Sequence, residues 1–133
     1  MWTVSLPIRI LLPRKKKDDV IFDLNLNTYR NTHYLILNEA KIRYKEIVTP
    51  LIKHIPKLEG CGMDFVLYPG SRRLCDVSNI CSIVEKFFND AFVEAGKIED
   101  DNYLFIPVSR YNFGAVDVNN PRVDLTIEPI LKE

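Results

Sequence analysis

Residues 79–96 read NICSIVEKFFNDAFVEAG and contain the clearest secondary-structure signal of the chain. Apolar residues recur there every three to four positions, which is the period of an α-helix with one buried face. The members of this stripe are Ile80, Ile83, Val84, Phe87, Ala91 and Phe92. Gly96 follows the stripe, and a glycine at that place commonly ends a helix in the left-handed conformation. We therefore predict a helix over residues 79–95 that Gly96 closes.

Strand patterns lie on both sides of this helix in the sequence. They are runs of β-branched, aliphatic and aromatic residues, several of which alternate between apolar and polar side chains. The predicted strands are residues 3–12, 20–24, 60–68, 103–112 and 122–130. Residues 14–19 read RKKKDD and are expected to form an exposed loop or hairpin tip.

A second helix is predicted over residues 38–54, with Asn38 as its N-cap. Pro50 lies within it and should kink or divide it, because proline lacks a backbone donor and clashes with the preceding turn. The polar segment 25–34 has the composition of a loop. The order β-(β)-α-β-α-β-β contains no repeat and no linker. We therefore predict one α+β domain over residues 1–133, a mixed sheet with two main helices on one face.

Composition excludes several classes of protein. The chain has 133 residues, of which 47% are hydrophobic and 27% charged, so it is neither disordered nor collagenous. We find no apolar run near the roughly 18 residues of a membrane span and no basic leader, so we expect a cytoplasmic protein without membrane contact. Cys61, Cys75 and Cys81 are odd in number and lack C-x-x-C spacing, which favours reduced thiols over disulfides or a zinc site.

Charge is unevenly distributed along the chain, although the formal net charge is zero. Residues 1–75 contain 13 Lys and Arg against 7 Asp and Glu, and residues 76–133 contain 5 against 11. Such a separation suits a protein that holds a polyanion and also binds a divalent cation. Phosphates attract Lys and Arg, whereas hard cations prefer oxygen ligands. Solvated surfaces that are charged by chance are the alternative explanation.

Polar residues flank the more C-terminal of the two predicted helices. Asp76 precedes it, and Asp100 and Asp101 follow it. A straight helix would hold these groups roughly 20 Å or more apart, so either the following turn folds back or another subunit completes the site. Asn79 and Lys86 are seven residues apart and share a helix face, where a lysine can orient a phosphate. The alternative explanations are that Asp76 only caps the helix, that Asp100 and Asp101 belong to a solvated turn, and that Lys86 is an ordinary surface lysine.

Together, these residues resemble the RusA family of Holliday-junction resolvases, many of which phages encode. The family pattern is D-x-D-N, then a helical K-x-x-x-D-A-L with a glycine, then a D-D pair before a terminal β-hairpin. In this chain the matching segments are Arg72-Arg73, Asp76-x-x-Asn79, residues 86–96 and Asp100-Asp101-Asn102. They span about a third of the sequence.

The resemblance implies a homodimeric, Mg²⁺-dependent endonuclease, with Mn²⁺ as an alternative ion, that resolves four-way DNA junctions. It implies that Asp76, Lys86 and Asp101 are catalytic, and that Asp76, Asn79, Asp100 and Asp101 bind the metal. The cations that we expect to hold flanking phosphates are Arg14, Lys15, Lys16, Lys17, Arg72 and Arg73. A phage-encoded member would act in the cytoplasm of the bacterial host.

Two features depart from the family pattern. Ser78 replaces the second aspartate of D-x-D-N and so removes a ligand that Mg²⁺ prefers. The interval from Asn79 to Lys86 is also about one helical turn longer. Glu85 is a candidate substitute, but on an ideal helix it projects about 120° away from Asn79. The alternative function is therefore a branched-DNA-binding protein without catalysis, and the third is an interaction protein whose acidic C-terminal half contacts a protein partner.

Overall fold

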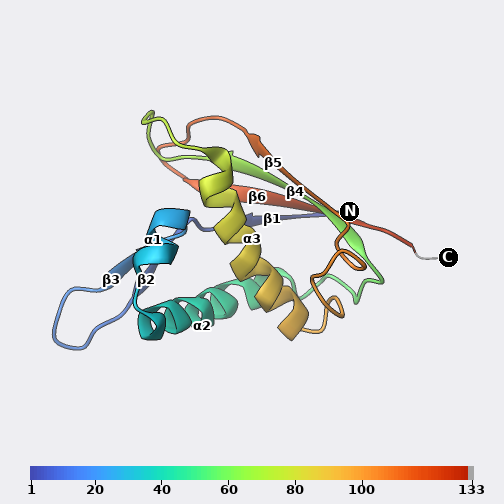
Figure 1. The fold of residues 1–133 in the computed structure, drawn as a ribbon, viewed down its shortest axis with the longest axis horizontal. Coiled ribbons are helices and arrows are strands. Elements are labelled where there is room, and N and C mark those ends of the chain that lie inside the picture. Colours follow the sequence, from blue (N-terminus) through green and yellow to red (C-terminus); the bar gives the residue numbers. More distant parts are fainter. Residues whose placement is uncertain (132–133) are drawn as a thin grey trace.

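Four strands form the main sheet of the computed structural model, which describes residues 1–131 (Figure 1). In spatial order they are β1 (Trp2–Leu6), β6 (Arg122–Pro129), β4 (Cys61–Tyr68) and β5 (Val108–Phe113). β4 runs parallel to β5, whereas β6 is antiparallel to both of its neighbours, so the sheet is mixed. Apolar side chains alternate along β4 and β6 and are buried on one face of the sheet, as their sequence period predicts.

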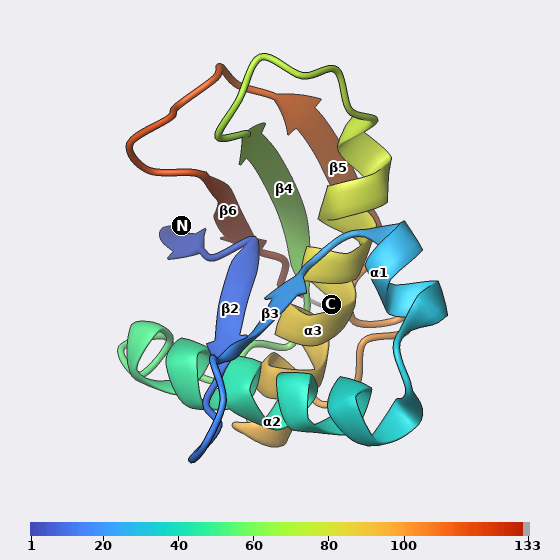
Figure 2. The ribbon, with the colours of Figure 1, turned by 90° about the vertical axis from the view of Figure 1, so that its left-hand side faces the viewer.

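α3 (Val77–Glu94) crosses that buried face and contacts β4 and β5. Its other side meets α1 (Leu26–Asn31), α2 (Tyr34–Leu51) and the hairpin of β2 (Arg9–Leu12) and β3 (Val20–Asp23). Figure 2 shows the hairpin on the side of α3 that faces away from the sheet.

Phe87 of α3 joins these layers. Its ring stacks on Phe22 of β3 with the ring centres 5.7 Å apart, and it meets Tyr44 of α2 edge-on at 5.6 Å. Gly96 ends the helix with a φ of 75°, as predicted. The predicted α3 is therefore confirmed, and it is buried on two sides instead of one.

The prediction of one strand over residues 3–12 was wrong. The structure has two strands there: β1 belongs to the main sheet, and β2 pairs with β3 in a separate hairpin. Pro7 lies between them, and proline has no N–H to donate to a ladder. Its carbonyl oxygen instead accepts a hydrogen bond of 2.9 Å from the Tyr44 hydroxyl, which fixes the crossing of the chain over α2.

The segment 25–34 is largely helical, where a loop was expected. α1 begins after Asn25, whose side chain accepts a hydrogen bond of 2.8 Å from the backbone N–H of Thr28. This is an N-cap interaction, which satisfies a backbone N–H of the first turn and stabilises the short helix. A helix of six residues is too short to show an apolar period in the sequence. α1 contains no fully buried residue, so hydrophobic patterning could not reveal it.

α2 also begins earlier than predicted. His33 is its N-cap, and Nδ1 of the imidazole accepts from the backbone N–H of Leu35 at 3.3 Å. Asn38 therefore lies inside the helix and does not cap it. Pro50 lies in the last turn, so the helix ends just after it at Leu51 and is not divided.

Two features of the C-terminal half differ from expectation. β5 begins at Val108, because residues 103–105 form a turn. β5 and β6 do not pair with each other, since β4 lies between them, and no terminal hairpin forms.

Contrary to the sequence prediction, the two main helices do not both lie on the sheet. α3 packs on the sheet, and α2 packs against α3 and β2. Within residues 1–131 no helix has the length and hydrophobicity that a membrane crossing requires.

Candidate functional site

A small polar hollow lies where the chain after α3 returns along that helix. We call it the α3 hollow, and its volume is about 380 Å³. Its lining residues are Ser82, Glu85, Lys86 and Asn89 of α3, with Asp101, Ile106 and Ser109 of the returning segment. Lys86 and Asp101 are 15 positions apart in the sequence. The turn that contains Asp101 therefore folds back beside the helix, which is one of the two arrangements expected from the sequence.

Backbone and side-chain hydrogen bonds hold this turn. The Asp100 carboxylate accepts from the backbone N–H of Asp101 at 2.8 Å and from the Asn102 amide at 3.1 Å. The Asn102 side chain in turn accepts from the N–H of Leu104 at 2.9 Å. Asp100 is thus engaged in shaping the turn, whereas the Asp101 side chain lines the hollow.

Asp101 lies in a negative environment. Partial burial raises the pKa of its carboxyl group, and the hydrogen bond to Asp100 and the charges of Asp100 and Asp90 raise it further. Lys86 is the cation that lines the same hollow, and its Nζ lies 5.8 Å from the centre of the Tyr29 ring. A carboxylate that is destabilised in this way is available to a cation that enters from solvent.

Glu85 faces β5 across the hollow. One of its carboxylate oxygens accepts from the Ser109 hydroxyl and the other from the Tyr111 hydroxyl, each at 2.5 Å. Burial, followed by the hydrogen bond to Glu85, raises the pKa of the Tyr111 phenol, which therefore stays a donor. β5 thus fixes the orientation of the Glu85 side chain.

Among the described residues, Asn89 is the one with an amide or charged side chain that is buried, with 6% of its surface exposed. Its Oδ1 has no hydrogen-bond partner within residues 1–131. A buried acceptor without a partner destabilises the fold by about 1–3 kcal/mol. An ordered water or a ligand that donates to this oxygen would remove the cost.

Asp76 and Asn79 line a different hollow, of about 680 Å³, at the other end of α3 together with Arg73. Asp76 occupies the N-cap position, but its side chain makes no capping hydrogen bond. Lys86 is ten residues further along, about 15 Å at the rise of a helix. In the part of the chain that the structure describes, no three or more His, Cys, Asp and Glu side chains form a group suited to a metal ion. One chain thus separates the predicted metal ligands into two places.

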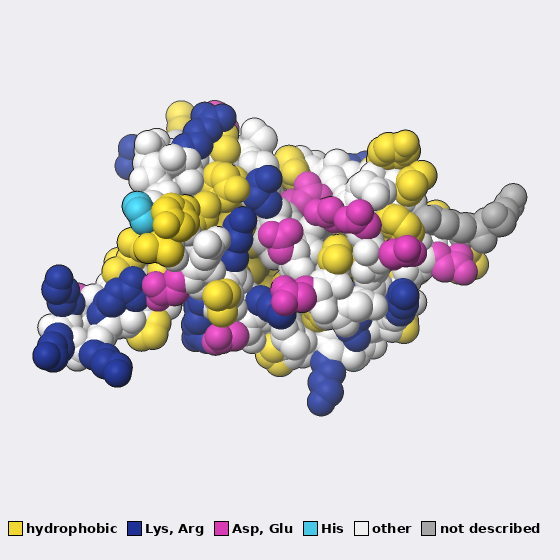
Figure 3. Space-filling model, turned by 60° about the horizontal axis from the view of Figure 1, so that its bottom comes forward, with side chains coloured by type: hydrophobic (Ala, Val, Ile, Leu, Met, Phe, Trp, Pro, Cys, Tyr) yellow, Lys and Arg dark blue, Asp and Glu magenta, His cyan; other side chains and the backbone are white. Residues whose placement is uncertain are grey.

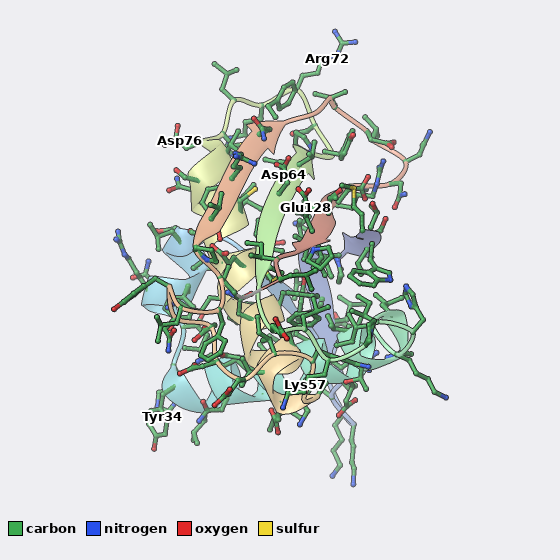
Figure 4. All side chains as sticks on the ribbon, turned by 90° about the vertical axis from the view of Figure 1, so that its right-hand side faces the viewer. Tyr34, Lys57, Asp64, Arg72, Asp76 and Glu128 are labelled. Atoms are coloured by element: carbon green, nitrogen blue, oxygen red, sulfur yellow. The ribbon has the colours of Figure 1, made fainter. Side chains whose placement is uncertain are left out.

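The predicted DNA-binding cations also fall into two groups. Arg72 and Arg73 are exposed in the loop before α3, at the end of the molecule opposite Lys57 (Figure 4). The exposed run of residues 15–17 forms the tip of the β2–β3 hairpin (Figure 3). Arg14 differs, because its guanidinium forms two hydrogen bonds with the Glu39 carboxylate, at 2.8 and 3.0 Å. Its charge is therefore compensated within the protein.

Two polar residues of the α3 hollow were not assigned a role from the sequence, namely Asn89 and Ser109. Ser82 was expected to lie with Asn79 and Lys86 in one polar strip of the helix. A signal for Asn89 existed. Ser82, Glu85 and Asn89 follow one another at spacings of three and four, so they share a side of a helix that is otherwise mainly apolar. Comparisons with known proteins add no assignment, because neither a scan against protein-family models nor a search of the curated proteins gave a match.

Proposed function

We propose that the protein is a Mg²⁺-dependent endonuclease that cuts branched DNA, with the four-way junction as its substrate, as the resemblance to the RusA family implies. The observation that supports this most is that Lys86 and Asp101 line one open hollow. The family pattern gives only the order of these two positions along the sequence. A chance match in sequence would not require both residues to line the same hollow.

The chemistry of the hollow fits a Mg²⁺ ion. Carboxylate and amide oxygens are the protein ligands that this ion prefers, and Glu85, Asn89 and Asp101 supply them. When bound, the ion would polarise the scissile phosphate and make water a stronger nucleophile. Lys86 lines the same hollow, and its ammonium group would stabilise the negative charge that develops on the phosphate.

Asp76 and Asn79 take a separate part in this proposal. Because they line the hollow at the start of α3, they reach Asp101 only if a second copy of the chain supplies them. The expected homodimer allows this. Arg73 lines that hollow, and with the neighbouring Arg72 it would hold a flanking phosphate, while the shape of the junction would determine specificity.

The test is cleavage of a synthetic four-way junction with Mg²⁺ and with EDTA. The wild type should cut only with Mg²⁺, and Asp101→Asn, Asp76→Asn and Lys86→Ala should bind the junction without cutting it. Asp64→Asn is the matched control, because Asp64 points away from α3 on the open face of the sheet (Figure 4). Normal cutting by Asp101→Asn would refute the assigned centre.

A branched-DNA-binding protein without catalysis is the second candidate. The observation in its favour is Ser78, which supplies no carboxylate at a position where the family pattern has one. Tight junction binding without cleavage in either Mg²⁺ or Mn²⁺ would select this candidate. A protein that binds no DNA at all would instead support the third, an interaction protein with an acidic C-terminal half.

A further inference from the structure

We propose that the β2–β3 hairpin is a docking surface for an extended acidic peptide, which adds to the hairpin as a third strand. The partner is a segment in which β-branched apolar residues lie next to a run of Asp or Glu. Residues 10–22 line neither the α3 hollow nor the hollow that contains Asp76. The docking surface therefore lies outside the proposed nuclease site.

The outer face of the hairpin presents two apolar side chains. Ile10 and Phe22 point inward and are buried. Leu11 and Ile21 point outward, and 52% and 55% of their surfaces are exposed. These two residues are directly opposite each other in the ladder, where the Cβ atoms of a pair lie roughly 4.5–5.5 Å apart. They therefore form one contiguous apolar patch on an uncovered face.

The same two residues direct their backbone groups to the edges of the hairpin. The backbone N–H of Leu24 donates to the carbonyl of Ile8 at 2.9 Å, in register with the ladder of β2 and β3. Hydrogen-bonded and non-hydrogen-bonded pairs alternate along an antiparallel ladder, so Leu11 and Ile21 form a non-hydrogen-bonded pair. Their N–H and C=O groups point outward. Within residues 1–131 no further strand pairs with β2 or β3.

Both edges lack the usual protection against strand addition. Natural proteins protect a free edge with charged side chains, especially lysine, or with proline. Residues 10–12 and 20–22 are all apolar. The charged residues of the strands, Arg9 and Asp23, compensate each other through a hydrogen bond of 2.6 Å from Nε to Oδ1. An additional strand would therefore meet no uncompensated charge along the hairpin.

The tip of the hairpin determines the charge of the partner. The lysines at residues 15–17 are exposed and form no ion pair within the described chain. Figure 3 shows dark blue side chains that extend from this tip. Asp18 and Asp19 follow the lysines, and Asp19 accepts a hydrogen bond of 3.4 Å from the backbone N–H of Arg14. The lysines outnumber these two acids, so the tip attracts carboxylates at the end of an added strand.

A peptide strand satisfies all three features, whereas other anionic partners leave one or two of them unused. A DNA backbone, the partner expected from the sequence, would contact the lysines but not the apolar pair or the edge. An anionic membrane would take up the apolar pair and attract the lysines. Its hydrocarbon would leave the outward N–H and C=O groups of Leu11 and Ile21 without partners. An added strand bonds to the backbone, packs on the apolar pair and brings its carboxylates to the lysines.

The test uses the full chain and a fluorescein-labelled peptide that joins a valine–threonine repeat to a run of aspartates. Fluorescence anisotropy should show saturable binding to the wild type. The double variant Leu11→Ser with Ile21→Ser should bind about tenfold more weakly or worse, because the peptide then loses apolar contact area. Changing the lysines at residues 15–17 to glutamine should weaken binding and reduce its salt dependence. Ile42→Ser is the matched control, since Ile42 is 61% exposed on α2, and it should bind as the wild type does.

Hydrogen exchange locates the added strand. In the free protein the amides of Leu11 and Ile21 should exchange much faster than those of Ile10 and Phe22, and the peptide should slow one of the first two. Unchanged exchange at both positions would overturn strand addition.

Three binding results would also overturn the proposal. They are the absence of saturable binding, equal binding by the double serine variant, and equal binding of a peptide with lysines in place of the aspartates. Hairpin-dependent binding of phosphatidylserine vesicles or junction DNA, without binding of the peptide, would show that the partner is a membrane or a nucleic acid. Neither readout uses junction cleavage, so a failure of the proposed nuclease function leaves the docking surface standing.

Discussion

Replacing Asn89 by leucine should stabilise the metal-free protein and remove its response to the ion. Leucine has the same branching as asparagine, with two bulkier methyl groups in place of the amide atoms, and places no polar atom in the buried position. The change removes an acceptor that has no partner, which is worth about 1–3 kcal/mol. The same substitution eliminates an oxygen ligand of the proposed cation site. The Asn89 side chain would therefore lower the stability of the metal-free protein and contribute to binding of the ion.

The expected size of the effect follows from the length of the chain. A domain of 133 residues unfolds with an entropy of about 0.28 kcal/mol/K, at about 2.1 cal/mol/K per residue, so the gain corresponds to a rise in Tm of about 4–11 °C. Saturating Mn²⁺ should distinguish the two proteins. It should stabilise the wild type by about 2.7 kcal/mol at a hundredfold excess over Kd, and leave Asn89→Leu almost unchanged.

Urea denaturation followed by circular dichroism, in EDTA and in Mn²⁺, measures both quantities. The slope m should stay constant, because the variant exposes the same surface on unfolding. Asn112→Leu is the matched control, since Asn112 is exposed and its amide donates to Asp64 at 3.0 Å. An Asn89→Leu variant that is less stable than the wild type in EDTA would refute the argument from the unpartnered amide.

Three further predictions concern charge and thiols. Changing Arg72 and Arg73 to glutamine should reduce the slope of log K against log[salt] for junction DNA by about 1.8 over about 50–200 mM KCl, measured by fluorescence anisotropy. A thiol reagent should modify Cys75 quickly in the native protein and all three cysteines only after unfolding, because Cys61 and Cys81 are buried. Burial raises the pKa of Cys61 to about 11 and of Cys81 to about 12, so the folded state favours neutral thiols. The free energy of unfolding should therefore fall above about pH 9, by about 1.4 kcal/mol per thiol and pH unit until the folded pKa is reached.

Controls and contrary outcomes are available for each of these three. Arg14→Gln should leave the salt slope unchanged, because Glu39 already compensates Arg14. An unchanged slope in the double variant would exclude the loop before α3 from the DNA contact. Rapid native reaction of a second thiol would contradict the burial of Cys61 and Cys81. The alkaline loss of stability should shrink when Cys81 is replaced by alanine, after correction for the packing that alanine loses.

The sequence predicted those parts of the fold in which the spacing of the apolar residues along the chain matches the face of the strand or helix that is buried. β4 and β6 alternate, and their apolar members are buried in register across the sheet. α3 has a continuous apolar stripe and a glycine that takes a positive φ at its end. In each case the local pattern and the tertiary packing require the same conformation.

The parts that the sequence missed depend on contacts between distant residues. α1 has six residues and no fully buried side chain, so its formation depends on the Asn25 cap and on contact with α3. The late start of β5 has a similar cause, because the backbone N–H of Cys61, the first residue of β4, donates to the carbonyl of Phe105 at 2.8 Å. No pattern within residues 103–107 contains that information.

The location of the candidate site follows from the two-sided burial of α3. One side of the helix packs on the sheet and another on α2 and the β2–β3 hairpin, so its polar residues are confined to the border between these contacts. The returning turn covers that border and brings Asp101 to it. A helix fixed from two sides holds Glu85, Lys86 and Asn89 at constant separations, and such rigidity is what a metal or phosphate site requires. Glu85 hydrogen-bonds to Ser109 and Tyr111 of β5, and Lys86 lines the same hollow as Asp101. The angle between Glu85 and Asn79 around the helix therefore does not determine which residues surround Glu85.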